Sequence, residues 1–200
     1  VEFTGCIVAA STGLFNTIID GEHLLYDKHQ NYINRYLMFD LYWLGGVDLR
    51  GYPFLKVPNL KYPPNSKMRQ DVSRFDKLSE INEKYLYNIE SIIPNKVPSL
   101  TIRIKKFYNN MGKKSIFRQC EHLLGKIEDA VDFDYETDGL VFTPIDTGVG
   151  SERIGDKLIP TKKTWMNCFK WKPLSQNTID FLVVTKKKGD TKSEYIGNLF

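Results

Sequence analysis

The chain has 200 residues, the length of one domain or of two small ones, and a formal net charge of +4. Hydrophobic residues make up 42% and charged residues 26%, a balance that excludes a disordered chain. No apolar run reaches the roughly 18 residues that span a bilayer, so we expect no membrane partner. Three widely spaced cysteines without a Cys-x-x-Cys motif favour reduced thiols over a disulfide framework or a zinc site.

The positive charge is concentrated near the end of the chain. Residues 161–200 contain eight lysines and only three acidic residues, so the remainder of the chain is almost neutral. A basic segment of this kind is a candidate contact for phosphate groups or a polyanion. A solvated basic edge would give the same pattern.

The N-terminal part of the chain is predicted to form β strands. Residues 17–20 and 36–44 are rich in β-forming side chains, and the polar stretch 27–34 between them is typical of a hairpin connection. Leu-Gly-Gly at 44–46 predicts a turn, and the prolines that follow predict an irregular stretch.

From residue 72 onward the apolar spacing changes to that of a helix. Apolar residues over 72–92 predict a long amphipathic helix that ends before Pro94. A second stripe over 116–131 predicts another helix with Ser115 as its N-cap, and we expect both stripes to lie in the core. Further strands are predicted at 100–108, 139–143 and 179–185. Strands and helices without regular βαβ alternation predict an α+β domain with largely antiparallel sheet.

Two short motifs combine carboxylates with glycine. Asp20-Gly21-Glu22 follows the first predicted strand, where a carboxylate pair beside a glycine suits contact with sugar hydroxyls or a metal. Asp138-Gly139 opens the strand predicted at 139–143, and Asp138 is a candidate ligand for a hard cation such as Mg²⁺. Each motif alone is also typical of a tight turn.

A third motif, Phe-Lys-Trp-Lys-Pro, occupies residues 169–173. On a strand, Lys170 and Lys172 would point to the same face and form a phosphate clamp, with Asp180 nearby to orient a lysine. Trp171, on the other face, is predicted to anchor the strand in the core. The alternative is an exposed edge strand that the lysines protect from aggregation.

Taken together and in this order, the motifs resemble the covalent nucleotidyltransferase superfamily and, within it, the mRNA capping guanylyltransferases. The resemblance spans roughly residues 17–185. The residues within the motifs are most similar to those of the large capping proteins of cytoplasmic DNA viruses. Its most specific part is Lys-Trp-Lys-Pro followed by Asn-Thr-Ile-Asp-Phe, which favours capping enzymes over ligases. The matching segments are 20–22, 36–40, 138–141, 170–173 and 177–181.

The resemblance implies a fold and a reaction. It implies an α+β nucleotidyltransferase domain, ATP-grasp-like, of antiparallel sheets with flanking helices, covering residues 1–185 and incomplete at both ends. Residues 186–200 would then begin the connection to an oligonucleotide-binding barrel. The reaction would transfer GMP from GTP, through a lysyl-GMP intermediate, to the 5′ diphosphate end of RNA. The expected location is the host cytoplasm or virion for a viral protein and the nucleus for a cellular one, and triphosphatase and methyltransferase domains are common companions.

The resemblance also implies which residues would bind the nucleoside. Glu22 would contact the ribose or a metal, and Phe39 would stack on guanine. Lys105 would read the edge of the guanine base, because an ammonium group can donate to the acceptor O6. Lys106 is the alternative register for that contact.

A second set of residues would bind the metal and the phosphates. By the same resemblance, Asp138 would hold Mg²⁺ or Mn²⁺, and Lys170 and Lys172 would contact the phosphates with support from Asp180.

The sequence departs from the family at the nucleophile. The family uses a lysine in a Lys-x-Asp-Gly motif, which this sequence lacks, since Glu136 stands at the position before Thr137-Asp138-Gly139. We therefore expect the nucleophile upstream of Val1 in a longer polypeptide, and no covalent GMP adduct on this chain alone. Two other functions stay open: an ATP-dependent polynucleotide ligase, and a non-catalytic RNA- or protein-binding module on the same fold.

Overall fold

The computed structural model of the chain describes most of its residues, and these divide into two compact units. The first unit comprises Val1–Thr137 and Val141–Phe169, and the second comprises Asp138–Leu140 and Lys170–Phe200. The described residues are 6–7, 14–64, 66–87, 89–91, 99–108, 115–129, 133–151, 154, 165–178, 182–188 and 192–198.

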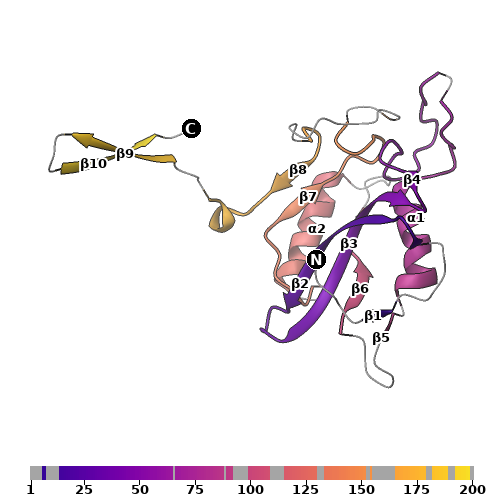
Figure 1. Ribbon diagram of the computed structural model, residues 1–200, viewed down its shortest axis with the longest axis horizontal. Coiled ribbons are helices and arrows are strands. Elements are labelled where there is room, and N and C mark those ends of the chain that lie inside the picture. Colours follow the sequence, from indigo (N-terminus) through magenta and orange to yellow (C-terminus); the bar gives the residue numbers. More distant parts are fainter. Residues whose placement is uncertain are drawn as a thin grey trace. The chain divides into compact units, whose positions relative to one another are not determined.

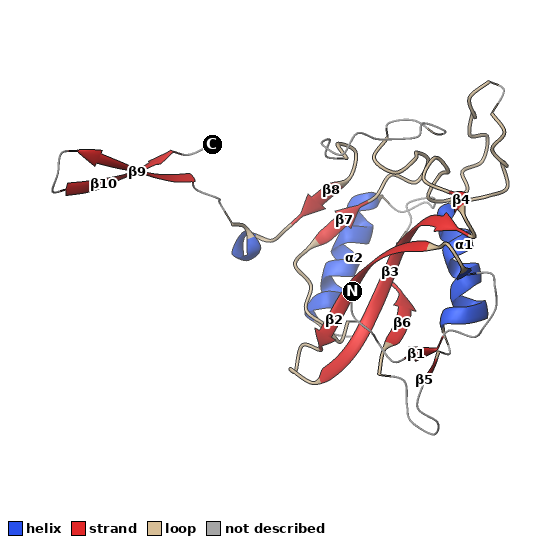
Figure 2. Ribbon diagram, viewed as in Figure 1, coloured by secondary structure: helices blue, strands red, loops and turns tan. Residues whose placement is uncertain are grey.

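The first unit is built on a four-stranded sheet (Figures 1 and 2). Strands β2 (Ile18–Tyr26) and β3 (Tyr32–Leu44) pair antiparallel along most of their length. Along the other edge of β3, strand β6 (Thr101–Ile104) pairs in parallel and β4 (Val47–Asp48) pairs antiparallel. The two predicted strands and the hairpin between them are thus confirmed, and both strands are longer than predicted.

Local interactions form the two turns of this sheet. In the β2–β3 turn, the Asp27 carboxylate accepts hydrogen bonds from the backbone amides of His29 and Asn31, each at 2.8 Å. Between β3 and β4, Gly45 and Gly46 have φ values of 58° and 82°, which glycine adopts without steric cost. The turn predicted at 44–46 is therefore confirmed.

Helix α1 (Arg74–Ile81) contacts β3 and supplies part of the core. Its N-cap is Ser73, whose hydroxyl accepts a hydrogen bond from the Asp76 amide at 3.2 Å. The apolar stripe of the helix is buried as predicted. The core cluster consists of Met38, Leu41, Leu49, Leu78, Ile81 and Leu86.

The prediction of one long helix ending before Pro94 was wrong. After Ile81 the chain forms a π-helical turn, η2 (Asn82–Leu86), and then the short strand β5 (Glu90–Ser91). Strand β5 pairs antiparallel with β1 (Cys6–Ile7), a long-range interaction that overrides the local helical pattern. Residues 92–98, the end of the predicted stripe, lie outside the described part of the chain.

Helix α2 (Ile116–Glu128) begins as predicted, with the Ser115 hydroxyl accepting from the Arg118 amide at 3.4 Å. The prediction that its apolar stripe lies in the core was wrong. None of the residues in α2 is buried, and Phe117 is 80% exposed. The amphipathic pattern is enough to form a helix, but burial depends on what packs against it.

The remaining strands form two small sheets. Strands β7 (Leu140–Phe142) and β8 (Phe169–Trp171) pair with each other, and the short 3₁₀ helix η3 (Leu174–Gln176) follows β8. Strands β9 (Leu182–Lys188) and β10 (Lys192–Asn198) form an antiparallel hairpin. The boundary expected at 185/186 falls within β9. Residues 179–181 lie outside the described part of the chain.

Helices combined with mostly antiparallel sheets confirm the α+β class. Among the described residues, no helix has both the length and the apolar character needed to cross a membrane.

Candidate functional site

Three of the predicted nucleoside-binding residues come together on strands β2, β3 and the end of β6. The Lys105 amide donates to the Met38 carbonyl at 2.8 Å and so extends the pairing of β6 with β3. The Lys105 Nζ atom lies 2.8 Å from Glu22 Oε2 and 5.9 Å from the centroid of the Phe39 ring. We call Glu22, Phe39 and Lys105 the Lys105 cluster.

The structure distinguishes Lys105 from its neighbour. Whereas Lys105 contacts Glu22, the Lys106 Nζ atom lies 6.0 Å from the centroid of the Phe133 ring. Consecutive residues of an extended chain point to opposite sides, which accounts for this separation. Of the two candidate lysines, Lys105 is therefore the one that contacts Glu22, and its role at guanine stays a prediction.

The pairing of β2 with β3 is interrupted twice close to the Lys105 cluster. At residues 18–19 of β2 the register skips Tyr42, and at residues 20–21 it skips Phe39. Such bulges redirect side chains and are frequent beside binding sites. The Asp-Gly-Glu motif therefore lies inside β2 at a bulge, so its predicted place at a strand end was wrong, as was the tight-turn alternative.

The glycine of this motif allows a close contact. A Cβ atom on Gly21 would lie 2.5 Å from Cζ of Tyr36 and 2.8 Å from the carbonyl oxygen of Leu37. Only glycine fits at this distance, which agrees with the close backbone approach expected from the sequence. Strand β3 can therefore lie tightly against the bulge.

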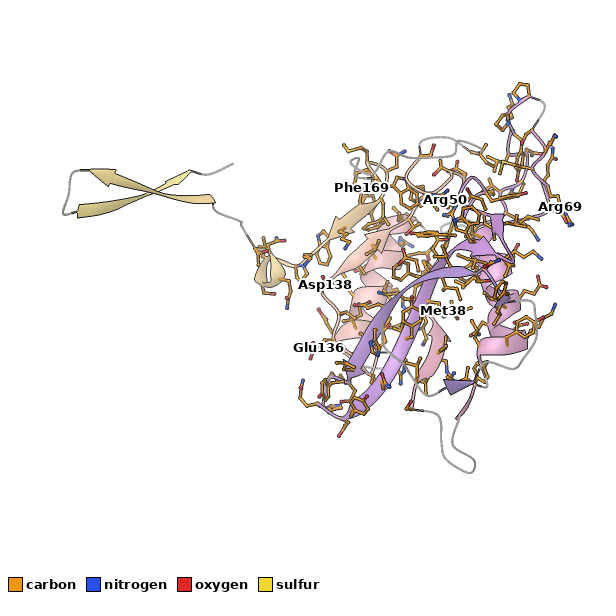
Figure 3. The ribbon with its side chains drawn as sticks, in the orientation of Figure 1. Met38, Arg50, Arg69, Glu136, Asp138 and Phe169 are labelled. Atoms are coloured by element: carbon orange, nitrogen blue, oxygen red, sulfur yellow. The ribbon has the colours of Figure 1, made fainter. Side chains whose placement is uncertain are left out.

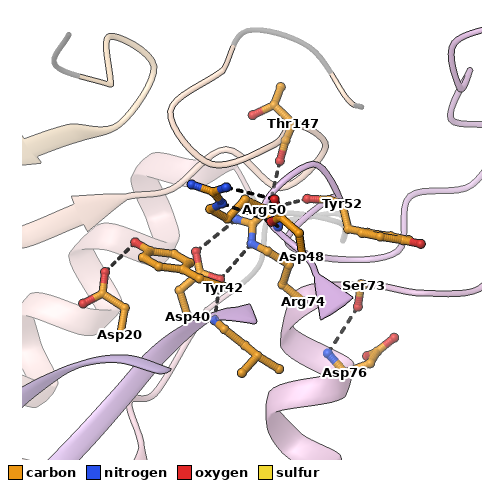
Figure 4. Close-up of polar contacts among 11 residues, drawn as sticks. Asp20, Asp40, Tyr42, Asp48, Arg50, Tyr52, Ser73, Arg74, Asp76 and Thr147 are labelled. Atoms are coloured by element: carbon orange, nitrogen blue, oxygen red, sulfur yellow. Dashed lines mark hydrogen bonds and ion pairs between the residues drawn. The ribbon is translucent and has the colours of Figure 1, made fainter. Parts of the chain in front are cut away.

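A buried ion pair joins Asp40 and Arg74 (Figure 4). Asp40, the residue after Phe39, accepts two hydrogen bonds from Arg74, at 2.8 Å from Nε and 3.1 Å from Nη2. Arg74 is fully buried and also donates to the carbonyls of Tyr52 and, at 3.1 Å, Thr147. Burial raises the pKa of Asp40, and the guanidinium opposes this rise.

Sequence reasoning missed Arg74. It stands at the start of a predicted helix, where a charged residue is unremarkable, and 34 positions separate it from Asp40. A usable signal was Asp40 itself, because a carboxylate within a strongly apolar strand needs a partner when it is buried. That signal does not say which cation is the partner.

A second group of predicted residues comes together in the second unit. The Lys172 Nζ atom lies 3.0 Å from Asp138 Oδ2. The hydrogen bond from Lys172 lowers the pKa of Asp138, and the positive charges of Lys172 and Lys170 act in the same direction. Gly139, with φ of 138°, packs so closely that a Cβ atom would lie 2.0 Å from the Trp171 carbonyl oxygen. We call Asp138, Lys170 and Lys172 the Asp138 cluster (Asp138 is labelled in Figure 3).

Two sequence-based predictions for this cluster were wrong, and a third concerns a residue outside the described part of the chain. Strand β8 ends at Trp171, so the strand predicted to contain both lysines is one residue too short to include Lys172. Trp171 is 43% exposed, so its predicted place in the core was also wrong. A two-stranded sheet offers few neighbouring side chains for burial. Asp180 lies outside the described residues.

Asp138 is the one residue of the Asp138 cluster whose side chain could be a ligand for a divalent cation. In the described part of the chain, no group of three or more His, Cys, Asp or Glu side chains could hold a metal ion. Asp138 offers one carboxylate, 70% exposed. Mg²⁺ at nucleotide sites takes one or two carboxylates and completes its shell with water and phosphate oxygens. Asp138 therefore suits such an ion only together with a phosphate ligand.

Both ion pairs are accessible to a ligand. The side chains of Lys105 and Glu22 are 35% and 49% exposed, and those of Lys172 and Asp138 are 39% and 70% exposed. Exposed pairs of this kind contribute about 0–1 kcal/mol to stability. An incoming polar ligand can therefore replace either pair at little energetic cost.

Comparison with known proteins found no match: neither a family model nor a curated protein matches the chain.

Proposed function

We propose that the chain is the nucleotide-binding part of an mRNA guanylyltransferase, which transfers GMP from GTP through a lysyl-GMP intermediate to the 5′ diphosphate end of RNA. The observation that supports the proposal is that Lys105 lies beside both Glu22 and Phe39. These residues come from three separate segments of the chain, and each has a nucleoside-binding role in the capping enzymes that the sequence resembles.

The chemistry of the Lys105 cluster suits a guanine nucleoside. Guanine presents the acceptors O6 and N7 where adenine presents an amino donor and N7. The ammonium group of Lys105 donates only, so it favours guanine. The Phe39 ring offers a face for stacking, and the Glu22 carboxylate accepts hydrogen bonds from ribose hydroxyls.

The chemistry of the Asp138 cluster suits phosphate. Phosphoryl transfer depends on positioning and on neutralising negative charge around the phosphates. In this proposal Lys170 and Lys172 supply positive charge, and Lys172 exchanges Asp138 for a phosphate oxygen. Asp138 would hold the Mg²⁺ or Mn²⁺ ion, which supplies further charge neutralisation when it is bound.

The proposal assigns the covalent step to a lysine that is not among these 200 residues, because the sequence contains no Lys-x-Asp-Gly motif. The chain itself binds and orients the nucleotide. Binding rather than adduct formation is therefore the property to measure on this chain.

Calorimetric titration with GTP and with ATP, in the presence of Mg²⁺, tests the proposal. We expect GTP to bind more tightly than ATP. Lys105→Ala should weaken GTP binding about tenfold, the value of one hydrogen bond from a charged donor, and leave ATP binding unchanged. Lys106→Ala is the matched control and should affect neither nucleotide.

Two outcomes would contradict the proposal. Tighter binding of ATP that is insensitive to Lys105→Ala would favour the polynucleotide ligase. Absence of GTP binding, together with RNA binding that does not need Mg²⁺, would favour the non-catalytic module.

A further inference from the structure

Tyr42, on β3, is left unpaired at the register shift between Ile18 and Ile19 of β2. Its hydroxyl donates a hydrogen bond of 2.5 Å to Asp20 Oδ2 (Figure 4). Burial, and then this hydrogen bond, raise the pKa of Tyr42, so the hydroxyl keeps its proton and can act as a donor. Tyr42, which is unpaired at the first bulge, is thus bonded to Asp20, which borders the second bulge at residues 20–21 of β2.

Asp20 occupies an unfavourable position without such a donor. It lies directly opposite Asp40 in the β2–β3 pairing, and like charges in opposite positions destabilise a sheet. Arg74 neutralises Asp40. The Tyr42 hydroxyl provides a hydrogen bond to the second carboxylate of this pair.

The Asp20–Asp40 pair borders the bulge that redirects Phe39. Phe39 precedes Asp40 on β3, and Gly21 and Glu22 follow Asp20 on β2. On the far side of the bulge, the Tyr36 ring lies against Gly21, and its hydroxyl donates to the Ile19 carbonyl at 3.2 Å. Two tyrosines of β3 therefore contact β2 at the motif: Tyr36 bonds the backbone at Ile19, and Tyr42 bonds the side chain of Asp20.

We propose that Tyr42 is a positioning residue of the nucleoside site: by holding Asp20 at the border of the bulge, it fixes the directions in which Glu22 and Phe39 project. The inference rests on the proposed function of the Lys105 cluster. Tyr42 itself contacts no part of the nucleotide in this scheme. It acts through the geometry of β2.

Tyr42→Phe removes the hydroxyl and keeps the ring, so the fold should persist. We expect about a fivefold loss of GTP affinity, the value of one misplaced hydrogen bond. Affinity for 2′,3′-dideoxy-GTP should fall by less, because that nucleotide lacks the ribose hydroxyls that Glu22 would bind and keeps only the guanine that Phe39 would contact. A general structural defect would weaken both nucleotides equally. Tyr26→Phe, at an exposed tyrosine of the neighbouring strand β2, is the control and should change neither affinity.

Hydrogen exchange in the nucleotide-free protein gives a second measurement. In Tyr42→Phe, the backbone amides of residues 19–22 should exchange faster, while those of β6 should exchange at the wild-type rate. Adding Asp20→Asn should restore protection, because a neutral amide opposite Asp40 removes the charge repulsion.

The two measurements separate the two proposals. Unchanged exchange at residues 19–22, or equal weakening of GTP and its dideoxy analogue, would overturn the role of Tyr42. Failure of the wild-type protein to bind GTP would instead overturn the proposed function, and a local change in exchange would still support the control of the bulge by Tyr42.

Discussion

At the scale of single residues, the Asp40–Arg74 pair is the interaction on which the site most depends. Arg74 joins the start of α1 to β3 and to the backbone at Tyr52 and Thr147. A buried pair of this kind adds little stability relative to apolar side chains, but removing one partner leaves an uncompensated buried charge. Because Asp40 follows Phe39, a disturbance of the pair would also reach the Lys105 cluster.

We expect Arg74→Met to destabilise the protein by about 3–5 kcal/mol, since Asp40 would remain buried without its cation. Urea unfolding followed by circular dichroism measures this change. Arg69→Met is the control, because the Arg69–Asp71 pair is 72% and 65% exposed and should have no measurable effect. Equal midpoints for the two variants would show that Asp40 does not depend on Arg74.

The residues of the Lys105 cluster could be predicted from the sequence, but their contacts could not. Glu22, Phe39 and Lys105 were named through a family resemblance, and the structure brings these three side chains together. Their distances and the choice of Lys105 over Lys106 come from the pairing of β6 with β3, which joins distant parts of the chain. Periodicity within a segment contains no information about such pairing.

At the scale of elements, the bulged β2–β3 hairpin is the feature that shapes the site. Two of its three register shifts are bulges that leave Tyr42 and Phe39 out of the ladder, and Gly21 permits the close approach of Tyr36. Both bulges are specific to the way the two strands meet. Neither could be predicted from the β-forming composition of each strand.

Gly21→Ala tests this element. The added methyl group would overlap the Tyr36 ring and the Leu37 carbonyl, so we expect a loss of about 1–3 kcal/mol in unfolding free energy and weaker GTP binding. Gly125→Ala on α2 is the matched control. No atom lies within 4 Å of its Cβ position, and alanine should stabilise the helix by about 0.5–1 kcal/mol. Equal stability of the Gly21→Ala variant and the wild type would contradict the tight packing at the bulge.

In the helices, too, features set by neighbouring residues were predicted correctly, and a feature set by distant residues was not. Ser115 caps α2 as predicted, because an N-cap involves only residues within one turn. The end of α1 was mispredicted, because β5 pairs with β1, which lies far away in the sequence near the start of the chain. Tertiary pairing decided that boundary.

At the scale of the whole molecule, the uneven distribution of charge is the feature that bears on RNA. The excess of lysine in residues 161–200 includes Lys170 and Lys172, which the proposed function places at phosphates. Each phosphate contact releases counterions, so it contributes to the salt dependence of binding. Charge alone does not distinguish these two lysines from other exposed lysines.

The salt dependence of RNA binding tests this distinction. If these lysines also contact RNA phosphates, replacing Lys170 and Lys172 together by alanine should reduce the slope of log K against log salt by about two, one unit for each lost phosphate contact. Replacing Lys61 and Lys67 removes the same charge from an exposed loop and should leave the slope near the wild-type value. Equal slopes for the two double variants would show that Lys170 and Lys172 contact no RNA phosphate and would confine their role to the phosphates of the nucleotide.

Local sequence patterns were enough to predict the α+β class, the strands of the central hairpin, the Gly45-Gly46 turn and the cap of α2. Each of these depends on interactions between near neighbours or on a repeating pattern within one segment. Contacts between distant segments determine that Tyr42 and Phe39 are left out of the β2–β3 ladder, that Arg74 neutralises Asp40, and that Trp171 is exposed. The reason is physical: strand register, buried ion pairs and burial itself are properties of contacts between segments that lie far apart in the chain.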